Sequence, residues 1–286
     1  MMTRRQFLKR AYRIGGIAAL AGLGLSPRAI ADFVRGHGGG TGFDWTSNLV
    51  LHLKMDSTQG ITWDEVSGSA LMTDANACGV DATDYKQGNQ SLDLYSGATQ
   101  HLYIADANYP AGAPGKSTGG SQDFLICFWV KIDDKSTTRM FVTKYRPVTG
   151  GRGFNVMYDQ GTDRFMIWVR AADDSVNLSE QFTQFNPVVD VWYHIGFWHS
   201  TVLGRVGLRV WDDTNAIVYN QSWIWTQGLF LNGQPFSVGY DRYDTGDGQQ
   251  PHDGHIDQVL VYKAVDDSAE SAIIAKIDSV RQGGAP

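Results

Sequence analysis

The chain has 286 residues, with 24 Lys and Arg against 30 Asp and Glu, and 42% of its residues are hydrophobic. An acidic chain repels the phosphate backbone of nucleic acids and anionic lipid headgroups, so the composition argues against both kinds of partner. Of the acidic residues, 27 are Asp and only Glu65, Glu180 and Glu270 are Glu. Because Asp favours turns whereas Glu favours helices, this bias predicts a turn-rich β protein.

The N-terminus has the pattern of an export signal. The stretch "TRRQFLKR" precedes a twelve-residue apolar run, "IGGIAALAGLGL", and "AIA" ends at Ala31. The order of arginine pair, short apolar run and small residues predicts cleavage after Ala31; an amphipathic helix is the alternative. The run is too short for a membrane span, which needs about 20 apolar residues.

The segment from Thr3 to Lys9 resembles the twin-arginine translocation consensus. The resemblance implies a protein that folds before export and then lies in the periplasm, outside the cell or at its surface, with no membrane insertion after cleavage. Without residues 1–31, 18 basic residues face 30 acidic ones, a formal charge of −12.

A glycine-rich connector at residues 32–42 leads into one predicted domain, residues 43–286. Alternating or continuous apolar stretches bounded by Gly, Asp, Asn and Pro turns predict its strands. In chain order these are residues 48–55, 90–95, 101–105, 123–132, 139–145, 153–159, 163–171, 191–200, 206–213, 236–241 and 254–262.

Two segments add to this pattern. The stretch "DFLICFWVKI", residues 123–132, is apolar on both faces, as an inner strand of a two-sheet sandwich would be. The last segment has a helical pattern, with Asp267 or Ser268 as N-cap, Glu270 in the first turn and Gly283 as the stop.

Six of these segments, in order, resemble the laminin-G-like or concanavalin A-like jelly roll. The matching stretches are "LVLHLKMDS" with "WDEVSG", "QGNQSLDLYSG", "DFLICFWVKI", "DVWYHIGFWHS", "GLRVWDD" and "HDGHIDQVLVYKAVDDSAESAII". The resemblance implies an all-β fold: a two-sheet antiparallel jelly-roll sandwich with a short C-terminal helix.

One residue of the last strand stands out. In "GHIDQVLVY", strict alternation puts the carboxylate of Asp257 on the same face as Val259 and Val261. A buried carboxylate needs hydrogen bonds or a cation. The family resemblance implies a structural calcium ion tying the first and last strands, with Asp56 and Asp257 as its acids, and calcium prefers such oxygen ligands. The alternative is that Asp257 accepts backbone N–H groups.

The sequence offers little support for a catalytic site, a transition-metal site or a disulfide. Glucanases of this superfamily resemble one another in an E-x-D-x-x-E strand, which this chain lacks, so we expect no enzymatic activity. His252 and His255 alternate across a strand without a third ligand, which favours hydrogen-bonded histidines. Cys78 and Cys127 could form a disulfide, although Cys127 lies in an apolar strand typical of a buried thiol.

Two features could bind sugars. Trp223 and Trp225 share one face of "QSWIWTQG" and could form a stacking platform, or pack in the core. The polar loop "GYDRYDTGDGQQPHDG" offers Tyr240, Tyr243 and Asp244 as a sugar-binding rim, or a second calcium loop, or a solvated loop.

The sequence therefore predicts an exported, non-catalytic module that binds a glycan or another cell-surface ligand and contains a structural calcium. A structural or adhesive protein that binds protein partners or self-assembles is the second hypothesis, because fold alone does not fix function. An atypical glycoside hydrolase is the third.

Overall fold

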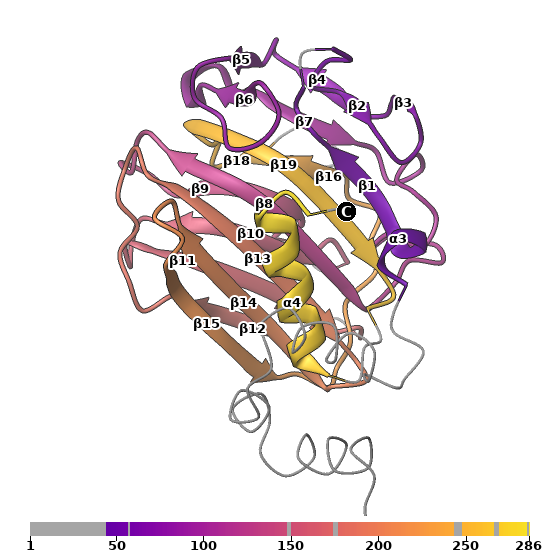
Figure 1. The fold of residues 1–286 in the computed structure, drawn as a ribbon. Coiled ribbons are helices and arrows are strands. Elements are labelled where there is room, and N and C mark those ends of the chain that lie inside the picture. The colour runs from indigo at the N-terminus through magenta and orange to yellow at the C-terminus, as the bar shows by residue number, and fades with distance from the viewer. Residues whose placement is uncertain are drawn as a thin grey trace, which may run out of the picture. The chain divides into compact units, whose positions relative to one another are not determined.

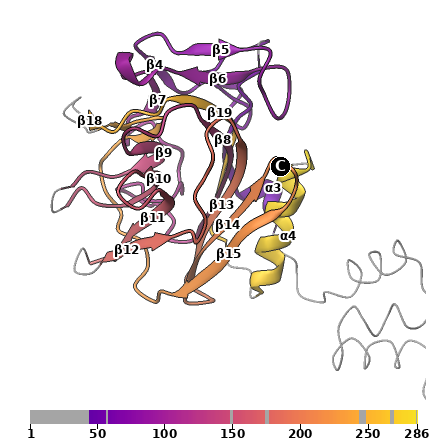
Figure 2. The same cartoon turned by 90° about the vertical axis from the view of Figure 1, so that its left-hand side faces the viewer.

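The structure is a computed structural model that describes residues 44–56, 58–147, 150–173, 177–242, 248–265, 269–284 and 286. The predicted signal peptide and connector lie outside the described residues. The rest forms two stacked antiparallel sheets, of eight and seven strands, with one helix on the outside (Figures 1 and 2). The predicted two-sheet jelly-roll sandwich is confirmed.

The eight-stranded sheet has the order β15-β14-β13-β8-β19-β6-β5, with β1 also paired to β19. Its strands are β1 (Leu49–Leu53), β5 (Gly79–Asp81), β6 (Ser91–Leu94), β8 (Phe124–Ile132), β13 (Trp192–Ser200), β14 (Arg205–Asp212), β15 (Ile217–Ile224) and β19 (Gly254–Lys263).

The seven-stranded sheet has the order β12-β11-β10-β9-β16-β7-β4. Its strands are β4 (Thr73–Ala75), β7 (His101–Ile104), β9 (Arg139–Lys144), β10 (Phe154–Asp159), β11 (Arg164–Arg170), β12 (Asn177–Phe182) and β16 (Phe236–Val238). Two small hairpins join β2 (Trp63–Asp64) to β3 (Ser69–Ala70) and β17 (Asp241–Arg242) to β18 (Gly248–Gln249). The short helices are α3 (Trp45–Asn48) and η1 (Ser96–Ala98).

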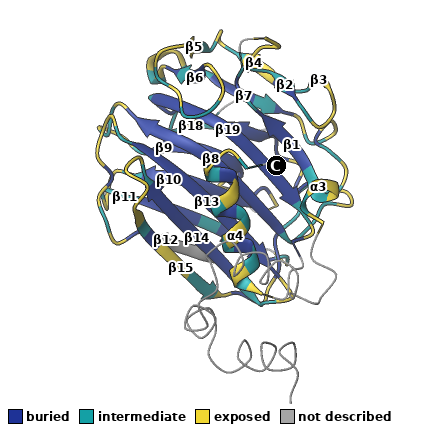
Figure 3. Ribbon diagram, in the orientation of Figure 1, coloured by how far each residue is buried: buried dark blue, intermediate teal, exposed yellow. Residues whose placement is uncertain are grey.

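The core fills the space between the inner faces of the two sheets (Figure 3). From β8, Phe124, Phe128 and Val130 enter it, and β10 and β11 supply Val156 and Ile167 from the opposite sheet. The other face of β8 is buried as well, which explains why this strand is apolar on both sides.

Helix α4 (Glu270–Arg281) lies across the outer face of the eight-stranded sheet and covers the second apolar face of β8 (Figure 1). Its buried residues are Ile273, Ile277 and Val280. Gly196 of β13 allows close contact, because a Cβ at this position would lie 2.5 Å from Ile277 Cγ2. The helix begins one residue after Ala269, which offers no side-chain cap, and the predicted N-cap residues 267 and 268 lie outside the described residues.

A β-bulge in β19 changes the face on which Asp257 lies. Gln258 has a φ of 53°, and the pairing with β8 shifts between Asp257 and Leu260. Val259 and Val261 therefore belong to the core, whereas Asp257 lies opposite Trp129 on the outer face. The predicted common face of these three residues is wrong, because alternation fails at a bulge.

Two long strands, β12 and β15, were not among the predicted strands; both are edge strands. Within the part of the chain that the structure describes, no helix combines the length and the apolar character of a membrane span.

Candidate ligand-binding face and carboxylate corner

The outer face of the seven-stranded sheet carries a row of polar and aromatic side chains. Their sequence neighbours Val142, Val156 and Ile167 belong to the core, so alternation directs the row away from it. Cross-strand pairing orders the row as Trp168, Asn155, Thr143, Ser237, Tyr103 and Thr73.

The middle of this polar row holds polar atoms without partners. The side chain of Asn155 is 0% exposed, yet neither its Nδ2 nor its Oδ1 has a hydrogen-bond partner. The same holds for Ser237 Oγ and for Trp168 Nε1. Each such buried group costs about 1–3 kcal/mol when left unpaired, so these positions favour a bound polar ligand or water.

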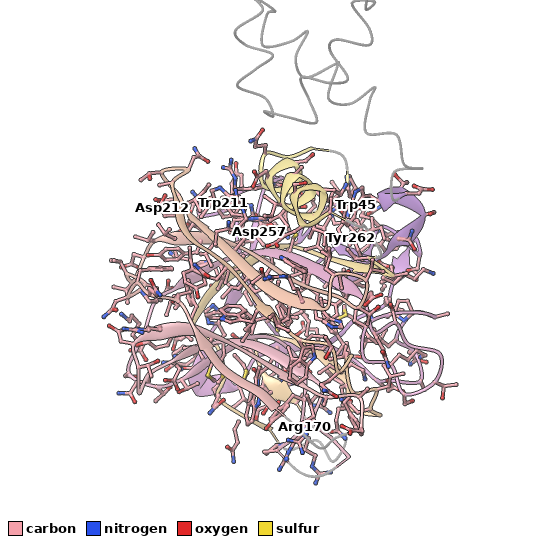
Figure 4. All side chains as sticks on the ribbon, turned by 90° about the horizontal axis from the view of Figure 1, so that it is seen from below. Trp45, Arg170, Trp211, Asp212, Asp257 and Tyr262 are labelled. Carbon is pink, nitrogen blue, oxygen red and sulfur yellow. The ribbon has the colours of Figure 1, made fainter. Side chains whose placement is uncertain are left out.

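Aromatic rings and arginines lie at one end of the row. The half-buried Trp168 packs at 4.8 Å against the ring of Tyr145, with an interplanar angle of 36°. Arg170 follows Trp168 on the same face of β11, and its N–H donates to Gly153 O at 2.8 Å. Figure 4 shows nitrogen-tipped side chains around Arg170. Arg152, beside Gly153, has a buried Nε without a partner.

The other end of the row contains a histidine between two tyrosines. The Arg242 guanidinium lies 3.8 Å from the ring centroid of Tyr103, and Tyr240 packs on His101 at 4.7 Å. Burial lowers the pKa of His101, so its neutral Nδ1–H donates to Thr99 O and Nε2 accepts from Arg242 Nη1 at 3.3 Å.

The loop residues predicted as a sugar-binding rim are only partly described. The predicted Tyr240 contacts this end of the row through His101, but it is only 8% exposed. The predicted Tyr243 and Asp244 lie outside the described residues.

The tryptophan pair predicted as a platform lies elsewhere. Trp225 is 5% exposed, belongs to the core, and donates Nε1–H to Gly228 O at 2.9 Å. Trp223 of β15 is half-buried and packs against the same core, and its ring centroid lies 6.4 Å from that of Tyr219. The structure therefore places the pair on the inner side of the eight-stranded sheet, where Trp225 offers no open face.

The two acids predicted to hold calcium bind one turn, residues 86–89. Asp257 Oδ2 accepts the backbone N–H groups of Lys86 at 2.9 Å and Gln87 at 2.8 Å. Asp56 Oδ1 accepts the N–H of Asn89 at 3.2 Å. Gly88 has a φ of +74°, and a Cβ there would lie within 2.3 Å of Asp56 Oδ1. Asp56, Asp257 and the turn 86–89 thus join the last strand to the segment after the first strand. We call this group of residues the carboxylate corner.

Asp257 retains one unused oxygen. Its Oδ1 is buried without a hydrogen-bond partner. Burial raises the pKa of Asp257 to about 7, opposed by the backbone N–H bonds and reinforced by the nearby Asp56. Among the described residues, no group of three or more His, Cys, Asp and Glu side chains could hold a metal ion.

The remaining candidates have structural partners. His252 Nε2 donates to Lys131 O at 3.0 Å. His255 Nδ1 lies 3.2 Å from Ser91 Oγ, and its Nε2 lies 3.5 Å from Asp133 Oδ2. Cys78 and Cys127 are both free, so the disulfide alternative is wrong.

Sequence reasoning did not identify the polar row. Its six residues lie on six different strands, so no local motif unites them. The available signal was Asn155 inside the otherwise apolar "GFNVMYD".

Comparison with known proteins gives the family. A family model described as the concanavalin A-like lectin/glucanases superfamily matches residues 96–270. No curated protein sequence matches the chain.

Solved structures resemble the fold at low identity. The crystal structure described as HCR/D-Sa-GBL1/C is 9% identical, with a TM-score of 0.50, over 82% of this chain and 52% of that one. The CBM40 of the Ruminococcus gnavus IT-sialidase, bound to α2,3-sialyllactose, is 10% identical, with a TM-score of 0.41, over 55% and 83%. Trypanosoma rangeli sialidase is 13% identical, with a TM-score of 0.49, over 84% and 34%.

This chain thus spans about half the length of the first of these structures and a third of the sialidase. At such identities the likeness concerns the fold alone. The family match covers more than half of the chain and agrees with the two-sheet architecture, so the chain belongs to the concanavalin A-like lectin/glucanase superfamily.

Proposed function

We propose that this chain is an exported, non-catalytic module that binds a glycan on the outer face of the seven-stranded sheet. The observation that carries the proposal is Asn155, whose amide donor and acceptor atoms are both unpaired; since its side chain is fully buried, a sugar reaches it only when neighbouring side chains move aside. An amide offers two donors and two acceptor lone pairs, which match the hydroxyl groups of a sugar. The family's own description, which names lectins and glucanases, supports this class of ligand.

The neighbours of Asn155 suit the rest of a sugar ring. The half-buried Trp168, with the buried Tyr145 packed against it, supplies aromatic surface for the apolar face of a pyranose, and Ser237 adds a hydroxyl. Arg152, whose buried Nε has no hydrogen-bond partner, lies at the same end and suits hydroxyl or acidic groups. Carbohydrate sites combine these features: a few placed polar groups and a flat aromatic surface.

The row itself argues for binding without hydrolysis. Glycosidases use two carboxyl groups about 5–9.5 Å apart, and none of the six side chains of the row is a carboxylate. Glu65 pairs with Lys54 at 3.4 Å, and Glu270 lies in the first turn of α4. The non-enzymatic assignment therefore remains part of the proposal.

A structural calcium ion at the carboxylate corner is the second part of the proposal. The residues that would hold it are Asp257, through its unused Oδ1, and Asp56; the other ligands would be backbone carbonyls and water. The unpaired buried oxygen fits a cation, because a positive charge would favour the ionised form of Asp257. Bound calcium would supply charge neutralisation to the corner and no chemistry to the polar row.

A glycan array probed with the full chain, with and without a chelator, tests the function. Binding that depends on Asn155 and Trp168 supports it, and release of reducing sugar from the bound glycan would show that the module is an enzyme instead.

A further inference from the structure

Strand β15 is a long edge strand without a charge, proline or glycine that would hinder pairing. It runs over eight residues, "IVYNQSWI", and none of them is charged, Pro or Gly. Ile217 is 53% exposed and Ile224 is 76% exposed, and the strand shows exposed and half-buried positions (Figure 3). Natural edge strands avoid self-pairing by shortness, charge, proline or bulges.

Strands β5, β4 and β1 also have an unpaired side in the described part of the chain, and each is protected. Both β5 and β4 are three residues long, and each contains an aspartate, Asp81 and Asp74. The segment around β2 covers β1, since the His52 N–H donates to Asp64 Oδ1 at 2.8 Å and the Glu65 N–H donates to His52 O at 3.0 Å. Strand β15 is interrupted only by the register shift opposite Val210 and Trp211, at its first residues.

The pattern of β15 complements itself. Tyr219, Gln221 and Trp223 share the inner face, because Tyr219 and Trp223 pack on the core with Gln221 between them. A two-fold axis perpendicular to the sheet reverses the strand and keeps each face on its own side, so inner residues of one copy must meet inner residues of the other.

We propose that two copies of this chain pair antiparallel through β15, with the two-fold axis at Gln221. In this register Gln221 lies opposite the partner's Gln221, and Tyr219 lies opposite the partner's Trp223. On the outer face Asn220 then meets the partner's Ser222. Aromatic pairs and amide pairs are favourable cross-strand neighbours, and antiparallel pairing adds backbone hydrogen bonds between the two edges.

Charge favours a second copy at this place. Without residues 1–31 the chain has a formal charge of −12, so two copies repel one another over most of their surfaces. None of the side chains of β15 carries a charge, and the guanidinium of Arg205, on the neighbouring β14, donates to Ser222 Oγ at 2.9 Å. Since a single strand pair buries little surface, the dimer is expected to depend on concentration.

Substituting the residue on the axis gives a direct test by analytical ultracentrifugation over a concentration series. The wild-type chain should approach the mass of two copies. Gln221→Lys and Gln221→Asp should each remain monomeric, because each puts two like charges opposite one another. An equimolar mixture of the two variants should restore the dimer, because Lys then lies opposite Asp.

Val202→Lys provides the matched control, since Val202 is an apolar side chain that is 58% exposed in the β13–β14 turn and not on β15. It should dimerise like the wild type. A wild-type chain that stays monomeric at all concentrations overturns the proposal, and so does a dimer that both Gln221 variants retain. This outcome is independent of glycan binding, which concerns the other sheet.

Discussion

The carboxylate of Asp257 accepts the backbone N–H of Gln87 at 2.8 Å, and the side chain of Gln87 donates to the carbonyls of Val280 and Arg281 at 3.1 Å. One turn therefore fixes both the last strand and the end of helix α4. The prediction from sequence that Asp257 either accepts N–H groups or holds a cation is confirmed for the first role, and the second remains a proposal.

Replacement of this anchor should destabilise the fold. Asp257→Ala leaves the N–H groups of Lys86 and Gln87 without their acceptor, and each such hydrogen bond contributes about 0.5–1.5 kcal/mol, because a carboxyl with a pKa of about 7 is only partly charged at neutral pH. We expect the free energy of unfolding to fall by about 1–3 kcal/mol in chemical denaturation. Gln87→Ala should lower it less and should increase hydrogen exchange at the end of α4. An Asp257→Ala chain as stable as the wild type would contradict the anchor role.

Calcium removal tests the second role of Asp257. If the ion occupies the carboxylate corner, a chelator should lower the melting temperature of the wild-type chain, because a ligand that binds only the folded state stabilises it. Asp257→Asn should abolish this sensitivity, whereas Gln87→Ala, which keeps both acids, should retain it. A melting temperature that chelation leaves unchanged would leave Asp257 as a hydrogen-bond anchor only.

The contact between Gly196 and Ile277 should depend on the missing side chain. In Gly196→Ala the new Cβ would lie 2.5 Å from Ile277 Cγ2, so helix α4 must shift or detach. Such overpacking costs about 1–3 kcal/mol. In a double-mutant cycle, Gly196→Ala should therefore lower the free energy of unfolding less in the Ile277→Ala background than in the wild type, because the shortened side chain leaves room for the new methyl group. Additive effects would argue against the contact.

The buried His252 predicts a loss of stability in acid. Burial lowers the pKa of His252 to about 3, below its ordinary value of 6.5. Below pH 6.5 His252 therefore takes up a proton in the unfolded chain but not in the folded chain, and its contribution to stability falls by about 1.4 kcal/mol per pH unit until about pH 3; Asp257, with its pKa raised to about 7, contributes with the opposite sign.

The variant His252→Gln keeps a donor for Lys131 O but cannot titrate. Its free energy of unfolding should fall less steeply between pH 6.5 and 5 than that of the wild type. His194, whose pKa burial also lowers to about 3, should leave a residual slope. Parallel pH profiles of the two proteins would contradict this prediction.

The sequence predicted the architecture because its strands are strongly apolar. The stretch around Phe124 and the alternation in "NLVLHLKM" were sufficient to predict β8 and β1. Strand β15 was missed because "IVYNQSWI" mixes polar and apolar residues without strict alternation, as an exposed edge allows.

The site was harder to predict than the fold. Gln258 adopts a left-handed conformation without being Gly or Asn, so nothing in the sequence marked the bulge that moves Asp257 to the outer face. The spacing of Trp223 and Trp225 predicted a stacking platform, but Trp225 packs in the core, whereas Trp168 lies on the polar row. Only pairing across six strands brings that row together.

The most direct test of the central claim is a comparison of glycan binding by variants of the two sheets. The best oligosaccharide from an array would be titrated calorimetrically into the wild type, Asn155→Ala, Trp168→Ala and the control Trp223→Phe, after circular dichroism shows that each is folded. We predict at least about fivefold weaker binding for Asn155→Ala and Trp168→Ala, since each removes about 1–3 kcal/mol of interaction, and unchanged binding for Trp223→Phe. Full affinity in both row variants, or no glycan bound by the wild type, would contradict the account.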